Sequence, residues 1–141
     1  MINDSHYDFL KLKKRPQWFS YICNKFSNCI MKIIIAGAGE VGFHLAKLLS
    51  YESLDITLID VERDRLNYAE GHLDIKTLRG NACSLSVLKE SNAAESDLLI
   101  AVTASESVNI TVCALAKQLG SKRTIARISN IEYTNTDNSI S

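Results

Sequence analysis

The chain has 141 residues, 46% of them hydrophobic, and its 16 lysines and arginines balance 16 aspartates and glutamates to a formal net charge of +0. That length permits one domain with an ordinary core, and the balanced charge gives no bulk electrostatic reason to expect a nucleic-acid partner. No apolar run approaches the roughly 18 to 20 residues of a membrane span, so we expect a soluble chain.

The cysteines give no sign of a disulfide framework or a metal site. Cys23, Cys29, Cys83 and Cys113 form no CxxC pair and show no ligand spacing with histidine. We therefore expect free thiols in a reducing cytosol and no bound metal.

Residues 1–30 differ from the rest, and Met31 reads like a natural start that leads directly into the first strand. We therefore treat residues 1–30 as an extension, in which apolar side chains recur at helical spacing behind the basic segment 11–15. This pattern suits a short amphipathic helix that begins near Pro16. Either it is a partly ordered extension or a helix packed on the domain or a neighbouring copy, or it contacts a membrane surface. The apolar side chains are Trp18, Phe19, Ile22, Phe26 and Ile30.

From residue 31 to 132, short apolar segments alternate with longer helical ones, and a polar tail, residues 133–141, follows. Such alternation requires right-handed crossovers between parallel strands. We predict a Rossmann-like, doubly wound α/β sheet that is mainly parallel, with strand order 3-2-1-4-5 and helices on both faces. The expected strands are 32–36, 55–60, 74–79, 97–102 and 122–128, and the expected helices are 40–51, 62–70, 84–91 and 106–119.

The first expected strand runs directly into the glycine-rich turn Gly37-Ala38-Gly39-Glu40-Val41-Gly42. Three glycines in this spacing, between a strand and a helix, are typical of dinucleotide binding. Gly37 makes the sharp turn, Gly39 lets the backbone approach a pyrophosphate, and Gly42 lets the helix pack closely on the sheet. The phosphates then lie on the free N–H groups of the first helical turn, where the helix dipole favours anions.

The second expected strand ends in Asp60, at the usual separation of roughly 20 residues from the glycines. A carboxylate here accepts hydrogen bonds from ribose hydroxyls and repels a 2′-phosphate, which favours NAD(H) or an adenosine nucleotide over NADP(H). Arg63 lies near enough in sequence to weaken that discrimination. The alternative is a glycine turn that only packs a helix on the sheet, with Asp60 as a helix cap.

The segments that follow strands three and four form the remaining walls of the expected site, because ligands lie outside the carboxyl ends of the strands. Gly80-Asn81-Ala82 follows strand three, and Asn81 either offers donors and acceptors to an adenine edge or makes a simple turn with Gly80. Val102-Thr103-Ala104-Ser105 follows strand four. Thr103 and Glu106 match a T-x-x-E capping box, which would begin the next helix and is compatible with contact to a ribose or nicotinamide.

Five segments stand in a recognisable succession: the run Lys32 to Gly42, Leu58-Ile59-Asp60 with Arg65-Leu66, Gly80-Asn81-Ala82, Asp97 to Thr103 with Glu106 and Asn109, and Ile125-Ala126-Arg127-Ile128. Together they resemble the nucleotide-binding N-terminal domain of the Trk-type potassium uptake regulators. The broader group is the RCK, or KTN, domain that gates potassium channels and transporters. The resemblance covers about residues 31–132 and is far more specific than the glycine pattern alone.

The resemblance implies a non-catalytic cytosolic module that binds NAD(H), or ATP, ADP or AMP, and forms a dimer or higher homo-oligomer. It also implies a partner, a potassium-translocating protein, at the inner face of the cell membrane. By position, the glycine turn would hold the phosphates, Asp60 the adenosine ribose, the segment 80–82 the adenine side, and residues 102 and 103 the distal ribose region. The candidate cofactor-binding residues are Gly37, Ala38, Gly39, Glu40, Val41, Gly42, Asp60, Val61, Gly80, Asn81, Ala82, Val102, Thr103 and Glu106.

Two features depart from the family pattern. Family members often carry Asp where Asn81 stands, so this chain has an amide in place of the family's carboxylate on the adenine side. The family also continues past strand five into a sixth strand, a crossover helix and a ligand-binding C-terminal subdomain, whereas residues 133–141 form a polar tail. We therefore expect a fragment, or one polypeptide of a split regulator.

Two other functional classes are a small NAD-dependent oxidoreductase fragment and a structural, partner-binding Rossmann domain with a vestigial site. A dehydrogenase needs a substrate domain, for which no room follows strand five, and Tyr133 has no lysine four residues later. His44 falls inside the first expected helix, and His72 follows Gly71, the expected end of the second. We expect both histidines to be structural or solvated, and no residue to be catalytic.

Overall fold

The computed structural model describes residues 30–129. The expected N-terminal helix, the polar tail and Tyr133 lie outside these residues. Five strands, five α-helical or 3₁₀ segments and their connections alternate along the described chain. In order they are β1 (Lys32–Ala36), α3 (Glu40–Ser50), β2 (Asp55–Asp60), α4 (Arg63–His72), β3 (Lys76–Arg79), α5 (Leu85–Glu90), the 3₁₀ helix η1 (Ala93–Glu95), β4 (Leu98–Ala101), α6 (Glu106–Leu119) and β5 (Thr124–Ala126).

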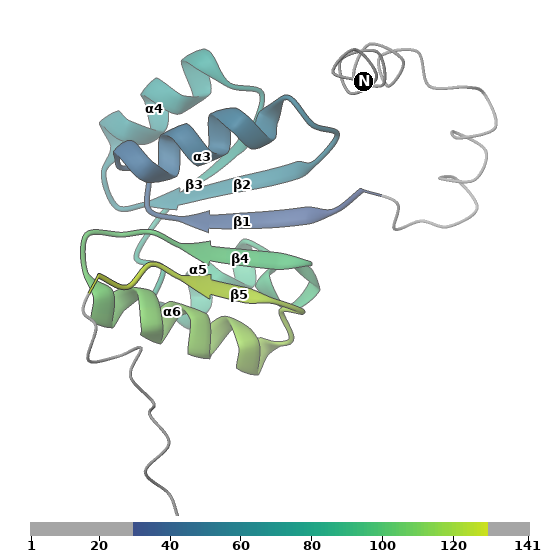
Figure 1. Cartoon of the computed structure of the whole chain (residues 1–141), viewed down its shortest axis with the longest axis vertical. Helices are drawn as coiled ribbons and strands as arrows, with labels where there is room; N and C mark the ends of the chain where they lie inside the picture. Colours follow the sequence, from purple (N-terminus) through teal and green to yellow (C-terminus); the bar gives the residue numbers. More distant parts are fainter. Residues whose placement is uncertain (1–29, 130–141) are drawn as a thin grey trace, which may run out of the picture.

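The strands form one sheet in the order β3-β2-β1-β4-β5, and every pairing is parallel (Figure 1). Central β1 pairs Ile33 with Ile56 of β2 on one side and with Leu98 of β4 on the other. This confirms the predicted Rossmann-like class and strand order. It also places the switch point, where the connections diverge, between β1 and β4. β5 is the edge strand, and its Ile125 is 53% exposed.

Each face of the sheet has its own apolar core because side chains alternate along the central strand. Ile33 and Ile35 pack with Ala46 of α3 and Leu66 of α4 on one face. On the other face, Ile34 and Ala36 pack with the residues that α5, η1 and α6 contribute. The two cores fix α3 and α6 on opposite faces, so that the loops that precede them meet at the carboxyl end of the sheet.

The element boundaries differ from the expected ones in physically simple ways. η1, which was not predicted, is a single three-residue turn, too short for a periodic apolar pattern. Gly71, the expected end of the second helix, instead lies inside α4, which ends at His72 with an extended Leu73 as its cap. The glycine that caps the C-terminus of a helix is Gly120, at φ +123°, whose N–H donates to the carbonyls of Ala116 and Lys117 at the end of α6.

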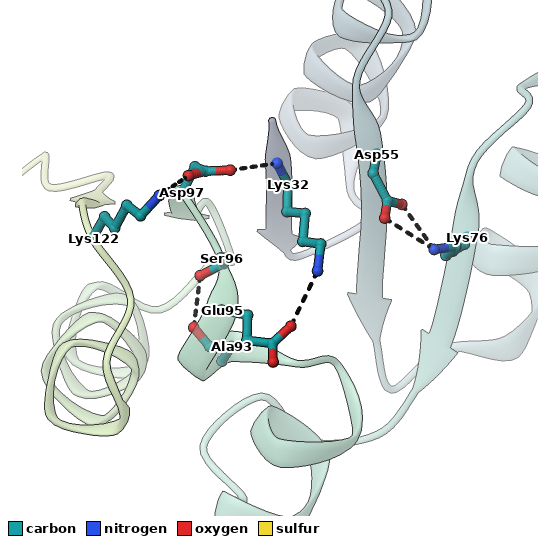
Figure 2. A network of polar contacts seen from close by, with 8 residues as sticks. All are labelled: Lys32, Asp55, Lys76, Ala93, Glu95, Ser96, Asp97 and Lys122. Carbon is teal, nitrogen blue, oxygen red and sulfur yellow. Dashed lines mark hydrogen bonds and ion pairs between the residues drawn. The ribbon is translucent and has the colours of Figure 1, made fainter. Parts of the chain in front are cut away.

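At the amino end of the sheet, ion pairs fasten the strands where they begin (Figure 2). Asp97 accepts hydrogen bonds from the backbone N–H of Lys32 at 2.8 Å and from Lys122 Nζ at 2.6 Å, so that it bridges the starts of β1 and β5. Lys76 Nζ lies 2.9 Å from Asp55, which joins β3 to β2 in the same way. These contacts position the strands at the end of the sheet opposite to the predicted site.

Among the described residues, Cys83 and Cys113 are free thiols, and burial raises the pKa of Cys113. The described part of the chain holds no group of His, Cys, Asp and Glu side chains able to bind a metal ion. None of its helices has the length and apolar character that crossing a bilayer requires.

The ion-paired Asp97 makes the free energy of unfolding depend on pH in the acidic range. Its hydrogen bonds with Lys122 and the Lys32 N–H lower its pKa below the ordinary value of 3.8. The carboxylate therefore stabilises the fold at neutral pH. This contribution is lost as the pH falls below 3.8 and through the lowered pKa of Asp97. We expect Asp97→Asn to unfold at lower urea concentration than the wild type at pH 7, with the difference shrinking toward pH 3. The exposed Asp74→Asn serves as control, and equal losses for both variants at pH 7 would contradict this role.

Two helical glycines provide a matched test of packing. A Cβ on Gly42 would lie 1.7 Å from the Gly37 carbonyl oxygen, whereas a Cβ on Gly71 would meet nothing within 4 Å. Gly42→Ala must displace backbone, so we expect a loss of about 2 kcal/mol or more in the free energy of unfolding. Gly71→Ala should raise it by about 0.5 to 1 kcal/mol. Denaturant titration of both variants checks the pair, and a neutral Gly42→Ala would show that the turn has room to relax.

Candidate functional site

A cleft of about 600 Å³ lies at the carboxyl ends of the strands, over the switch point. The loops after β1, β2, β3, β4 and β5 all contribute to its walls. The candidate residues that line it are Gly37, Gly39, Glu40, Val41, Asp60, Val61, Gly80, Asn81, Ala82, Val102 and Thr103. The fold thus brings these segments, distant in sequence, around one opening.

The glycine turn leaves the start of α3 open toward this cleft. Gly37 has φ +110°, and a Cβ there would lie 2.9 Å from the backbone nitrogen of Thr103, so the turn passes directly beside the β4 exit. At Gly39, the atom nearest to an added Cβ would be Arg65 Nη1, at 4.0 Å. Gly39 is the N-cap of α3 and offers no side-chain cap, so the first-turn N–H groups face a space that an anion can enter.

Ala38 and Gly42, also candidates, support the turn and do not line the cleft. Ala38 is 6% exposed, and its backbone N–H donates to Asp60 Oδ2 at 2.6 Å. Gly42 packs against the Gly37 carbonyl, as its predicted packing role requires. Both residues act on the site through the shape of the turn.

Asp60 joins the end of β2 to the glycine turn. Its residue surface is 8% exposed; Oδ2 accepts from Ala38 N–H, and Oδ1 accepts from Glu62 N–H at 2.8 Å. Glu62, not Asp60, is the N-cap residue of α4. The carboxylate therefore has a structural role, and it also forms part of the cleft wall. Because a carboxylate has about four acceptor positions and these two N–H groups use two of them, it retains capacity to accept from a ligand.

The arginine beside Asp60 is Arg65, not Arg63. Arg65 Nη1 lies 3.8 Å from Asp60 Oδ2 and lines the cleft. Arg63 lies instead in a separate hollow with Glu70 and Arg79. Sequence proximity suggested Arg63 as the cation near Asp60, whereas α4 begins at Arg63 and its first turn carries Arg65 to the cleft side.

The segment after β3 forms a tight turn at the cleft wall. Asn81 Oδ1 accepts from the Cys83 N–H at 2.9 Å, and the Asn81 carbonyl accepts from the Ser84 N–H at 2.8 Å. The Gly80 N–H donates to the Asp60 carbonyl at 2.9 Å, which holds this turn beside the end of β2. The two interpretations of Asn81 are therefore compatible, because a turn residue here also lines the cleft.

The expected capping box after β4 does not form. The N-cap of α6 is Ser105, whose Oγ accepts from the Val108 N–H at 3.4 Å. Thr103 Oγ1 donates instead to Asn109 Oδ1 at 2.7 Å, a buried acceptor unavailable in an isolated capping box. Glu106 does not line the cleft, and its Oε1 accepts from the Ser129 N–H at 2.7 Å.

Four lining residues were neither among the candidates nor in the expected walls: Ile59, Arg65, Val108 and Arg127. Arg127 follows β5 at the same edge of the sheet, and its N–H donates to the Ala101 carbonyl at 2.9 Å. The signal for Arg127 was its position directly after the last strand, because all parallel strands end at one edge. With Arg65 it adds a second cation to a cleft whose glycine turn is already suited to anions.

Comparison with known families fixes the relationship of this chain. The family model of the TrkA-N domain matches residues 33–138. The chain belongs to the TrkA-N domain family. The resemblance to the Trk-type regulators is thereby confirmed, and the glycine turn, Asp60 and the β4 exit all fall within the matched range.

Among relatives of this TrkA-N domain is the Trk system potassium uptake protein TrkA of Haemophilus influenzae, which is 44% identical over 104 residues. The match covers 73% of this chain and 23% of that protein. Other TrkA relatives, from Halomonas elongata and Vibrio alginolyticus, are matched over 22% and 23% of their length. The chain therefore spans about a quarter of the curated relatives it matches.

Two solved structures share the fold. The GsuK channel bound to NAD superposes with a TM-score of 0.62 at 16% identity, over 76% of this chain and 20% of that one. The Shewanella denitrificans Kef C-terminal domain in its AMP-bound form gives a TM-score of 0.56 at 22% identity, over 67% of this chain and 56% of that one. At these identities the likeness shows the Rossmann-like fold of the TrkA-N domain.

The structural role of Asp60 predicts a stability change in the absence of any ligand. Asp60→Asn replaces one carboxylate oxygen by an N–H₂ group, which cannot accept from Ala38 or Glu62. We expect a loss of about 1 to 3 kcal/mol in the free energy of unfolding, measured by urea titration without nucleotide. Asp74→Asn should change it by less than about 0.5 kcal/mol. If both variants unfold alike, the Asp60 hydrogen bonds do not hold the turn.

Proposed function

We propose that this TrkA-N domain is a non-catalytic sensor that binds an adenine nucleotide and regulates potassium uptake. NAD(H) is the first candidate, with ATP, ADP or AMP as alternatives. The observation that carries the proposal is the uncapped N-terminus of α3, which opens at Gly39 into the cleft that Asp60 also lines. An anion-binding helix end beside a ribose-accepting carboxylate matches a phosphorylated nucleoside.

The phosphates would lie over Gly39 and the first turn of α3. A ligand can approach the backbone closely there, because the atom nearest to a Cβ added at Gly39 would be Arg65 Nη1, 4.0 Å away. Arg65 and Arg127 line the same cleft and carry the positive charge that phosphates attract. Thr103 and Val102 bound the distal end, where the second ribose of a dinucleotide would lie.

The adenosine would lie toward the ends of β2 and β3. Asp60 retains acceptor capacity for ribose hydroxyls, and Gly80, Asn81 and Ala82 form the adjoining wall for the adenine. A 2′-phosphate at this position would meet the Asp60 carboxylate, while Arg65 at 3.8 Å offsets part of that repulsion. We therefore infer a preference for NAD(H) over NADP(H), smaller than an isolated carboxylate would give.

Regulation would follow from differential binding. A nucleotide shifts an assembly between states only if it binds one of them more tightly. The relatives named as potassium uptake proteins support a partner of that kind, a potassium-translocating membrane protein at the inner face of the cell membrane. By the same family relationship, the domain would work as a dimer or higher homo-oligomer in the cytoplasm.

The positions of the histidines support a non-catalytic role. His44 Nδ1 lies 2.7 Å from the Glu40 carbonyl, and His72 Nδ1 lies 2.7 Å from the Tyr68 carbonyl, each one turn earlier on its own helix. Both are exposed, and neither lines the cleft. Within the described residues, histidine therefore supplies no proton-transfer group beside a bound nicotinamide.

Calorimetric titration with NAD⁺, NADH, NADPH, ATP, ADP and AMP tests the proposal. We expect NAD(H) to bind most tightly and Asp60→Ala to weaken it by about tenfold or more, through loss of a charge-assisted hydrogen bond. Gly39→Ala separates binding from folding, since its Cβ has room in the free protein but intrudes on the phosphate position. That variant should melt like the wild type and lose affinity for ADP more than for adenosine.

Three outcomes would count against this proposal. Failure of every nucleotide to bind would remove the sensor mechanism and favour a partner-binding domain with a vestigial site. A clear preference for NADPH would overturn the role given to Asp60. Hydride transfer to an added substrate would indicate an oxidoreductase fragment.

A further inference from the structure

Asn109 is a buried polar side chain that holds two walls of the cleft without lining it. It lies in the first turns of α6 and is 1% exposed. Its amide lies between the loop after β4, which carries Thr103, and the chain that leaves β5 at Arg127. A buried amide must have its hydrogen bonds satisfied, so this position constrains whatever surrounds it.

All four hydrogen-bonding positions of the Asn109 amide are used. Oδ1 accepts from the Thr103 N–H at 2.8 Å and from Thr103 Oγ1 at 2.7 Å. Nδ2 donates to the Thr103 carbonyl at 3.2 Å and to the Arg127 carbonyl at 2.9 Å. Because the acceptor faces only Thr103 and the donor reaches both residues, the amide has one satisfied orientation.

The link to Arg127 extends the sheet beyond its last backbone hydrogen bond. The Arg127 N–H still pairs with Ala101 of β4 at 2.9 Å, and the Arg127 carbonyl pairs with Asn109 instead of with a strand. One turn earlier on α6, Glu106 accepts from the Ser129 N–H at 2.7 Å. The start of α6 therefore holds the chain from residue 127 to 129 against the end of the cleft.

We propose that Asn109 is a positioning residue for the nucleotide site, acting through the backbone of Thr103 and Arg127. This inference rests on the proposed nucleotide binding and adds the residue that sets the distal, cationic wall. Thr103 and Arg127 line the cleft from the ends of different strands, and Asn109 fixes one relative to the other. Its ligand class is a phosphorylated adenosine, because Arg127, whose backbone carbonyl it holds, lines the cleft and carries a positive charge.

A double-mutant cycle separates positioning from general stability. The variants are Asn109→Ala, Arg127→Ala and their combination, titrated calorimetrically with ADP and with adenosine as the phosphate-free probe. Ser96→Ala is the matched control, since Ser96 is also 1% exposed and its hydroxyl lies 2.8 Å from Ser121 Oγ at the opposite end of the sheet. Thermal melting of each variant measures the accompanying loss of stability.

We expect Asn109→Ala to weaken ADP binding about tenfold and adenosine binding less than about threefold. In the Arg127→Ala background, Asn109→Ala should weaken ADP binding less than about threefold, because the guanidinium whose backbone Asn109 positions is already absent. Ser96→Ala should lower the melting temperature and leave ADP affinity unchanged.

Additive effects in the cycle would overturn the positioning role, as would equal losses of ADP and adenosine affinity in Asn109→Ala. A loss of ADP affinity in Ser96→Ala matching that in Asn109→Ala would also overturn it, since both would then follow stability. Normal ADP binding by Asn109→Ala, with a wild type that binds, rejects this inference alone. A wild type that binds no nucleotide rejects the proposed function together with it.

Discussion

The hydrogen bond from the Ala38 N–H to the Asp60 carboxylate is the contact on which the carboxyl end of this domain depends. It spans 2.6 Å between the turn after β1 and the end of β2. The Asp60 backbone carbonyl accepts a hydrogen bond from the Gly80 N–H, so the ends of β1, β2 and β3 meet at Asp60. Gly37 and Gly42 are then required to be small, because the turn held in this way passes against the β4 exit and the first turn of α3.

Much of the fold follows from short-range patterns. Ile33, Ile34 and Ile35 are apolar on both faces, which only a sheet covered on both sides accommodates, and both cores are present. The glycine spacing and Asp60 located the cleft, because strand ends in a parallel sheet converge. Two boundaries differed from the prediction, because η1 is too short for periodicity and because the neighbours of Gly71 keep the helical hydrogen bonds.

The parts of the site that the sequence did not predict depend on which partner each side chain reaches in the folded chain. Thr103 has the spacing of a capping residue with Glu106, but Asn109 offers it a buried acceptor and Ser129 engages the Glu106 carboxylate. Arg65 and Arg127 belong to the recognised motifs, yet no local rule directs a long side chain toward a cleft. Contacts made in the folded chain therefore determine where the side chains of these four residues lie. Backbone geometry, in contrast, determines where glycine is required.

The exposed edge at β5 has a consequence for how this domain meets other chains. β5 has three residues and pairs only with β4 in the described sheet, leaving one side of its backbone without a strand partner. A strand edge with unpaired N–H and C=O groups accepts a further strand, so among the described residues β5 is a place where another extended segment can pair.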